Sequence, residues 1–242
     1  RLGFESEDML YSDYEKLKNA LNFVELVPIK DEITRLRRIK TPKELERIRI
    51  AESIGDKVFS EILNFIKPGV TELEVAARIE YLLKLYGGER TSFPAIVASG
   101  VNSSMPHAVP TSKKIEKGDF VTMDFGCVYE GYCSDMTRTI VVGKATDKQK
   151  EIYNLVLEAQ LAALDTLKAG LKGKDVDKVA RDIIYNAGYE GCFGHGLGHS
   201  VGLFIHENPR LSATEEDIIE AGMVETVEPG IYIRGFGGVR IE

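Results

Sequence analysis

The sequence predicts a mixed domain of helices and strands, built as two similar halves. Capping boxes, in which a threonine is followed three residues later by Glu or Gln, mark helix starts at Thr41, Thr71 and Thr146. Residues 67–78 resemble residues 168–181, about a hundred positions later in the chain. We therefore expect each half to hold two helices plus strands, with the strands of both halves meeting along a shared central cleft.

The predicted helices follow from their caps, their apolar spacing and the glycines behind them. Apolar side chains recur at helical spacing after each cap, and Pro42 occupies the first helical position after Thr41. Glycines, which favour helix ends, follow at Gly69, Gly87 and Gly170. The predicted helices span residues 41–67, 71–87, 146–169 and a further stretch that runs up to Gly188.

Composition and charge exclude several classes of function. The net charge of −7 and the sequence pI near 5.3 argue against nucleic acid and anionic membranes as partners, because both favour clustered Lys and Arg. No apolar run approaches the roughly 20 residues of a membrane helix, and residues 1–6 lack the apolar stretch of a signal peptide. The cysteines, Cys127, Cys133 and Cys192, form no Cys-x-x-Cys pair. We expect a globular cytoplasmic protein without a disulfide framework.

Two aspartates are predicted to face each other on a β-hairpin. Residues 120–126 alternate apolar and polar, which places Asp124 on the polar face, and residues 132–142 form the returning strand. A turn centred between residues 129 and 130 makes Asp124 and Asp135 direct neighbours, with Cβ atoms roughly 5 Å apart. Because close carboxylates repel, they need a cation or a shared proton. A glycosidase-type acid pair and two solvated aspartates are the alternatives.

Most of the histidines are concentrated in one short segment. Three of the four lie within residues 195–206. His195 and His199 have the i, i+4 spacing of a helical zinc motif, but the glycines around them would cost such a helix roughly 1 kcal/mol each. In an extended chain the two side chains still share a face. One or both imidazoles can therefore reach a metal, and the pattern alone does not decide between them.

Two glutamates and an arginine complete the candidate set near the end of the chain. Glu228 precedes Pro229, which favours extended backbone at the start of a turn. Residues 237–242 are predicted to be a strand in which Arg240 and Glu242 share a face. Each acid is weak evidence alone, and it gains weight only beside the aspartates and histidines.

Six segments, taken together and in order, resemble the Xaa-Pro aminopeptidase and prolidase branch of the methionine aminopeptidase-like superfamily. They are residues 99–107, 123–126, 134–139, 194–199, 227–230 and 239–242. The resemblance implies an α+β pita-bread (creatinase/aminopeptidase) fold for residues 41–242, with two pseudo-symmetric halves around a central curved sheet. It also implies that residues 1–40 are the tail of a truncated N-terminal domain plus a linker, and that the catalytic domain is incomplete at its C-terminal end.

The resemblance further implies a set of metal ligands. By position they are Asp124, Asp135, His199, Glu228 and Glu242. Asp124 would bind one ion, His199 and Glu228 would bind the other, and Asp135 and Glu242 would bridge the pair. Oxygen-rich coordination with one imidazole accommodates two divalent ions, with manganese or cobalt expected and zinc or iron as alternatives.

Catalytic roles are implied for residues around this set. His107, His195 and His206 would surround the substrate and steady the oxyanion or the leaving proline nitrogen. Glu228 would move the proton of the attacking water, and Arg240 would orient the acids. This assignment takes His195 out of the metal shell, which the spacing alone does not do.

The implied activity is hydrolysis of the bond between an N-terminal residue and a following proline by a metal-bridging hydroxide. The substrate would be a peptide with proline in second position, either a dipeptide or a longer chain, and we expect a homodimer. Methionine aminopeptidase is an alternative, although residues 102–107 resemble the proline-specific branch more closely. A catalytically inactive pita-bread binding module is a second alternative; it would lack ligands, and none is missing. Creatinase shares the fold without this metal set.

Overall fold

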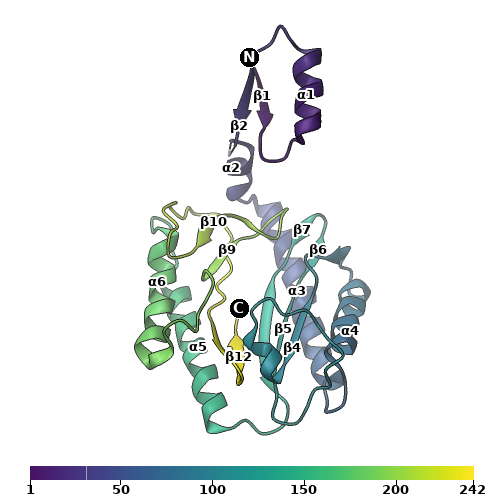
Figure 1. The fold of residues 1–242 in the computed structure, drawn as a ribbon, viewed down its shortest axis with the longest axis vertical. Coiled ribbons are helices and arrows are strands. Elements are labelled where there is room, and N and C mark those ends of the chain that lie inside the picture. Colours follow the sequence, from purple (N-terminus) through teal and green to yellow (C-terminus); the bar gives the residue numbers. More distant parts are fainter. Residues whose placement is uncertain (31) are drawn as a thin grey trace.

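The computed structural model describes residues 1–30 and 32–242. Figure 1 shows a larger body of helices and strands, with a small β-α-β unit projecting from one end. In this unit β1 (Leu2–Glu5) pairs in parallel with β2 (Leu26–Ile29), and α1 (Tyr11–Ala20) connects the two strands. The short helix α2 (Glu32–Arg38) then leads into the larger body.

The first half of the body contains two helices and two small antiparallel sheets. Its helices are α3 (Pro42–Phe65) and α4 (Glu72–Leu85). One sheet has the order β4 (Ile96–Ser99), β5 (Phe120–Phe125), β8 (Met136–Val141). The other has the order β3 (Arg90–Thr91), β6 (Cys127–Tyr129), β7 (Tyr132–Cys133), and a 3-10 turn, η1 (Gly100–Ser104), follows β4. Both predicted capping boxes are present, so the helix starts are confirmed.

The second half repeats the two helices and two antiparallel sheets, but each of its sheets has two strands instead of three. Its helices are α5 (Asp147–Thr166) and α6 (Gly173–Ile184), and α6 continues into a π-helical turn, η2 (Tyr185–Tyr189). Two antiparallel pairs follow: β9 (Gly198–Ser200) with β10 (Glu207–Leu211), and β11 (Gly230–Ile233) with β12 (Gly237–Arg240). In Figure 1, α3 and α4 lie on one side of the strands and α5 and α6 lie on the other.

The predicted internal repeat corresponds to equivalent turns in the two halves. Gly69 and Gly170 each end the loop after the first helix of their half, with φ of 95° and 94°. The amide of Gly69 donates to Ile115 O at 2.9 Å, and the amide of Gly170 donates to Ile219 O at 2.9 Å. The positive φ explains why both turns carry glycine. The prediction of two similar halves is therefore confirmed.

The hairpin forms as predicted, but its register differs by two residues. Asp124 lies opposite Thr137, so Asp135 is a diagonal rather than a direct neighbour, and the predicted direct pairing is wrong. The reason is the turn: Glu130 and Gly131 are its two central residues, with φ of 44° and 84°, as a tight two-residue hairpin requires. Because the shift is two residues, both aspartates keep the same face.

Each half has its own apolar core, and strands β8 and β12 join the two halves. The first core packs α3 and α4 against β5, and the second packs α5 and α6 against β11 and β12. Thr139 on β8 donates its hydroxyl to Arg240 O on β12 at 2.9 Å, which joins the strands of the two halves. Within the described residues, no helix has both the length and the apolar character needed to cross a membrane.

Candidate metal centre

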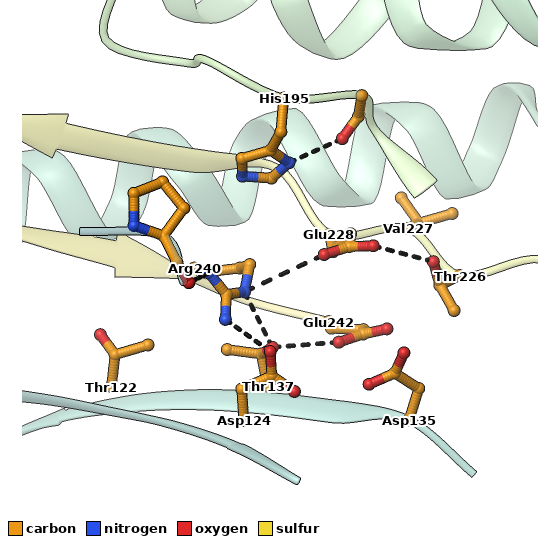
Figure 2. A network of polar contacts seen from close by, with 12 residues as sticks. Thr122, Asp124, Asp135, Thr137, His195, Thr226, Val227, Glu228, Arg240 and Glu242 are labelled. Carbon is orange, nitrogen blue, oxygen red and sulfur yellow. Dashed lines mark hydrogen bonds and ion pairs between the residues drawn. The ribbon is translucent and has the colours of Figure 1, made fainter. Parts of the chain in front are cut away.

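Three carboxylates from the two halves converge between β5 and β12. Asp124 and Asp135 come from the first half, and Glu242 follows β12 in the second. Each places an oxygen within 4.8 Å of the others. Figure 2 shows them gathered beside Arg240, together with Glu228. Carboxylates this close repel unless a cation or protons lie between them.

His199 faces the same acids from β9. Its Nε2 lies 3.4 Å from Asp135 Oδ2 and 3.5 Å from Glu228 Oε1. Its Nδ1 lies 3.0 Å from the Ser200 carbonyl oxygen, which can only accept. In the neutral ring Nδ1 therefore carries the proton, and the lone pair of Nε2 points toward the carboxylates. This is the tautomer that a metal-binding histidine adopts.

The carboxyl groups are held in an unfavourable setting for negative charge. Burial, followed by the charge of Asp124, raises the pKa of Asp135 well above its usual range. Burial and the neighbouring acids do the same to the pKa of Glu242, and burial raises the pKa of Glu228 to about 7. Asp124 Oδ1 and Glu242 Oε1 are buried without a hydrogen-bond partner among the described residues. These orphaned oxygens fit divalent cations, which would favour the charged carboxylates.

Arg240 connects the acids to one another. Its Nη2 donates to Asp124 Oδ2 at 2.6 Å, and its Nε lies 4.0 Å from Glu228 Oε2. The Nε also donates to Thr137 Oγ1 at 3.0 Å, and that hydroxyl donates to Glu242 Oε2 at 3.0 Å. A single buried guanidinium thus fixes the orientation of acids from both halves (Figure 2).

His195 is bound to protein groups at both ring nitrogens. Its Nδ1 lies 2.7 Å from Gly196 O and its Nε2 lies 2.8 Å from the Tyr232 hydroxyl. Since Arg240 Nη1 donates to that hydroxyl at 2.8 Å, the tyrosine donates its own proton to His195 Nε2. Burial lowers the pKa of His195 to about 4 and raises that of Tyr232 to about 12. His195 is therefore a neutral acceptor that faces Tyr232 rather than the carboxylates.

A cavity of about 560 Å³ opens over the acids. His107 and His206 line it, and the His206 ring packs edge-on against His199 with centroids 4.5 Å apart. Burial, and then the nearby His199, lowers the pKa of His206 to about 4. One wall is apolar and consists of Phe93, Pro94, Ala95, Ile96, Ala108, Val109 and Pro110. Arg210, a cationic side chain, also lines the cavity.

The residues predicted from the sequence therefore lie around one site. Eight of them line the cavity: Asp124, Asp135, His199, Glu228, His107, His195, His206 and Arg240. Glu242 lies within 4.8 Å of the two aspartates and lines a neighbouring hollow of about 340 Å³. The division into bridging and terminal ligands stays a prediction. Sequence reasoning missed Tyr232 and Arg210; the position of Tyr232, four residues after Glu228 along an extended segment, was the available signal.

Known proteins share this fold and sequence. The sequence pattern of metallopeptidase family M24 matches residues 46–242. An Xaa-Pro dipeptidase from Pyrococcus horikoshii is 48% identical over 241 residues, which is 100% of this chain and 68% of that protein. The solved structure of an Xaa-Pro dipeptidase from Bacillus anthracis superposes with a TM-score of 0.98 at 50% identity, covering 100% of this chain and 68% of that one. An X-Pro aminopeptidase from Thermotoga maritima superposes at 0.95 with 40% identity, covering 99% and 68%.

Fold, carboxylate centre and relatives define a metal-dependent hydrolase. The chain belongs to metallopeptidase family M24. The α+β pita-bread fold predicted from the sequence is confirmed, and so is the resemblance to the Xaa-Pro aminopeptidase and prolidase branch. The predicted boundary between residues 1–40 and 41–242 stays a prediction.

Proposed function

We propose that this chain is an Xaa-Pro dipeptidase that uses two divalent metal ions. The observation that carries the proposal is the convergence of Asp124, Asp135 and Glu242 within 4.8 Å, with buried oxygens that have no partner among the described residues. Ions bound at such a centre supply an acidified water and polarise a carbonyl group. The proposed ligands are these three acids with His199 and Glu228.

The residues around the centre then have separate tasks. Glu228, whose pKa burial raises to about 7, is placed to take a proton from the attacking water and pass it to the proline nitrogen. His206, whose pKa of about 4 keeps it neutral, and His107 can hydrogen-bond the developing oxyanion. Arg240 holds Asp124 and Glu228 in place, and Tyr232 holds the ring of His195, which burial keeps neutral.

The cavity wall favours proline. A prolyl peptide bond has no N–H, so the site needs no acceptor for one. The pyrrolidine ring needs apolar contact instead, which Pro94, Val109 and Pro110 offer beside His107. This wall supports cleavage before proline over the methionine aminopeptidase alternative.

Arg210 favours dipeptides over longer peptides. Its guanidinium makes no hydrogen bond or ion pair with the described residues, although it lines a cavity rich in acids. In an Xaa-Pro dipeptide the free carboxylate follows the proline directly and can pair with a guanidinium. A longer peptide carries a neutral amide there. We therefore propose that Arg210 binds the terminal carboxylate of the dipeptide.

The test compares hydrolysis of Xaa-Pro dipeptides with that of Xaa-Pro tripeptides, with manganese or cobalt supplied. We expect dipeptide cleavage to dominate. In Arg210→Gln we expect kcat/KM for dipeptides to fall by about 10-fold to 100-fold, since a hydrogen bond to a charged group is lost, while tripeptide cleavage stays unchanged. Arg234→Gln, an exposed arginine of the same half, is the control. Absence of cleavage of either substrate by folded, metal-loaded enzyme would contradict the function, and equal loss on both substrates would contradict the role of Arg210.

Metal identity and assembly are also part of the proposal. Oxygen-rich ligands with one imidazole suit manganese or cobalt, with zinc or iron as alternatives, and activity after reconstitution with each ion ranks them.

We propose a homodimer, which sedimentation velocity tests. A cytoplasmic location stays a prediction, as does the absence of nucleic-acid and membrane partners, which the net charge of −7 supports.

A further inference from the structure

A buried carboxylate on α4 binds both ends of the loop that carries His107. Glu72 Oε1 accepts from the amide and hydroxyl of Ser99 at 2.7 and 2.8 Å, and from Asn102 Nδ2 at 3.1 Å. Glu72 Oε2 accepts from the amide and hydroxyl of Thr111 at 3.0 and 2.6 Å. Ser99 ends β4 and Thr111 closes the loop. One side chain thus joins the two ends of residues 99–111.

These bonds do not serve the helix on which Glu72 lies. Thr71 and Glu74 already form the capping box of α4, with the Thr71 amide donating to Glu74 Oε2 at 2.8 Å. The Glu72 carboxylate is fully buried, and its donors Ser99, Asn102 and Thr111 belong to the loop. Burying a carboxylate is costly unless hydrogen bonds satisfy it, so its place under the loop indicates a specific role.

The position of His107 depends on this loop backbone. The His107 side chain is exposed and makes no hydrogen bond with the described residues. In the middle of the loop, Pro106 O accepts from Arg240 Nη1 at 3.1 Å, so the backbone there is bonded to the arginine that orients the acids. The next residues, including Val109, form the apolar wall of the cavity. A shift of the loop therefore moves a histidine and the substrate-binding wall together.

We propose that Glu72 is a positioning residue for the reaction, acting through the loop of residues 99–111 on His107. The inference rests on the proposed function, because the consequence that matters is the placement of His107 against substrate. Glu72→Gln keeps the shape but replaces one acceptor oxygen with a donor. Either the Thr111 amide or, with the side-chain amide turned over, the Ser99 amide then faces an NH₂ group instead of an oxygen, so one end of the loop loses a backbone hydrogen bond to residue 72.

The first test is a double-mutant cycle in metal-loaded enzyme. We expect Glu72→Gln to lower kcat/KM for an Xaa-Pro dipeptide by about 10-fold to 100-fold, because small misplacements of catalytic groups are costly. Bound metal should be unchanged. In a His107→Ala background the same substitution should cost less than about 3-fold, since the two changes act through one group. Glu80→Gln, an exposed glutamate on the same helix, is the matched control and should have no effect.

The second test does not depend on activity. Hydrogen–deuterium exchange should show faster exchange in residues 103–110 of Glu72→Gln, with α3 and α5 unchanged. Should Glu72→Gln fail to fold, Thr111→Val removes one donor to the same carboxylate and should give the same pattern with a smaller loss. Unchanged loop exchange, or an equal loss of activity with and without His107, would overturn the proposal. If the wild-type enzyme cleaves no Xaa-Pro peptide, the proposed function fails while the exchange experiment still tests the attachment.

Discussion

The first half holds its histidine loop with a carboxylate and neutral donors, whereas the second half uses a carboxylate together with an arginine. On α6, Asp177 accepts from Leu197 N at 3.1 Å and pairs with Arg181 at 2.7 Å. Arg181 Nη2 in turn donates to His195 O at 2.8 Å. Asp177 thus holds the His195 segment as Glu72 holds the His107 loop. Both carboxylates lie on the second helix of their half and both are buried.

The difference between the halves has a steric cause. Glu72 begins α4, and the equivalent first residue of α6 is Gly173. A side chain at Gly173 would meet the carbonyl oxygen of Arg210, so no carboxylate fits there. In the second half the anchoring acid stands four residues later, at Asp177, one turn along the helix. In both halves the second helix therefore holds a histidine-bearing segment with a buried carboxylate, but the carboxylate occupies a different position on the helix.

A second pair of acids lies behind the metal centre, one from each half. Glu52 on α3 accepts from the amide of Asp135 at 3.1 Å, and Glu225 accepts from the hydroxyl of Ser200, next to His199. Burial raises the pKa of both glutamates to about 7. Each half therefore supports one of its proposed ligands with an acid that resists ionisation.

The largest effect is expected where the two halves meet. Asp135→Asn removes one of the proposed bridging ligands, and we expect activity to fall by at least about 100-fold to 1,000-fold and bound metal to decrease. Metal content by mass spectrometry and dipeptide hydrolysis measure both. His206→Ala is the control: it should retain its metal and lose turnover only. Equal metal loss in the two variants would contradict the proposed ligand set.

The next effect concerns Asp177, the carboxylate that holds the His195 segment. Asp177→Asn leaves the guanidinium of Arg181 without its charged partner, and we expect a loss of about 3 kcal/mol in the free energy of unfolding. Urea unfolding measures it. Asp182→Asn breaks only an exposed pair on the same helix, with Lys178, and should cost less than about 1 kcal/mol. Comparable losses in the two variants would show that Asp177 does not anchor the His195 segment.

A smaller, pH-dependent effect tests Glu52, the acid of the first half that lies behind the metal centre. The pKa of Glu52 is raised from 4.5 to about 7, chiefly by burial and also by the charge of Asp135, so the stability contributed by the protonated form is lost as pH rises through 7. In chelator-treated protein, the free energy of unfolding of Glu52→Gln should therefore exceed that of the wild type by on the order of 2 kcal/mol at pH 8 and by little at pH 5. Glu46→Gln, on the exposed face of α3, is the control. A gain that does not depend on pH would refute the assignment.

The sequence predicted what local patterns encode. The capping boxes at Thr41, Thr71 and Thr146 are present, and the repeated glycine turns occur in both halves. The hairpin aspartates were placed on the correct face because the side-chain period of a strand is two. Their register was wrong because it depends on the turn conformation at Glu130 and Gly131.

Contacts between distant segments could not be predicted in this way. The bonds from Glu72 reach residues 27 to 39 positions away, and the bond between His195 and Tyr232 spans 37. No periodicity in the sequence encodes such pairs, since they exist only after the strands have met. The spacing of His195 and His199 left both as candidate ligands; the structure turns the first toward Tyr232 and the second toward the acids.

The most direct test of the account is anomalous diffraction from crystals of the protein grown with manganese. The account predicts two strong peaks about 3.5 to 4 Å apart, between Asp124 and His199, with Asp135 from one half and Glu242 from the other contacting both. A single peak bound only by acids of one half, or a peak bound by His195, would contradict a centre assembled by both halves.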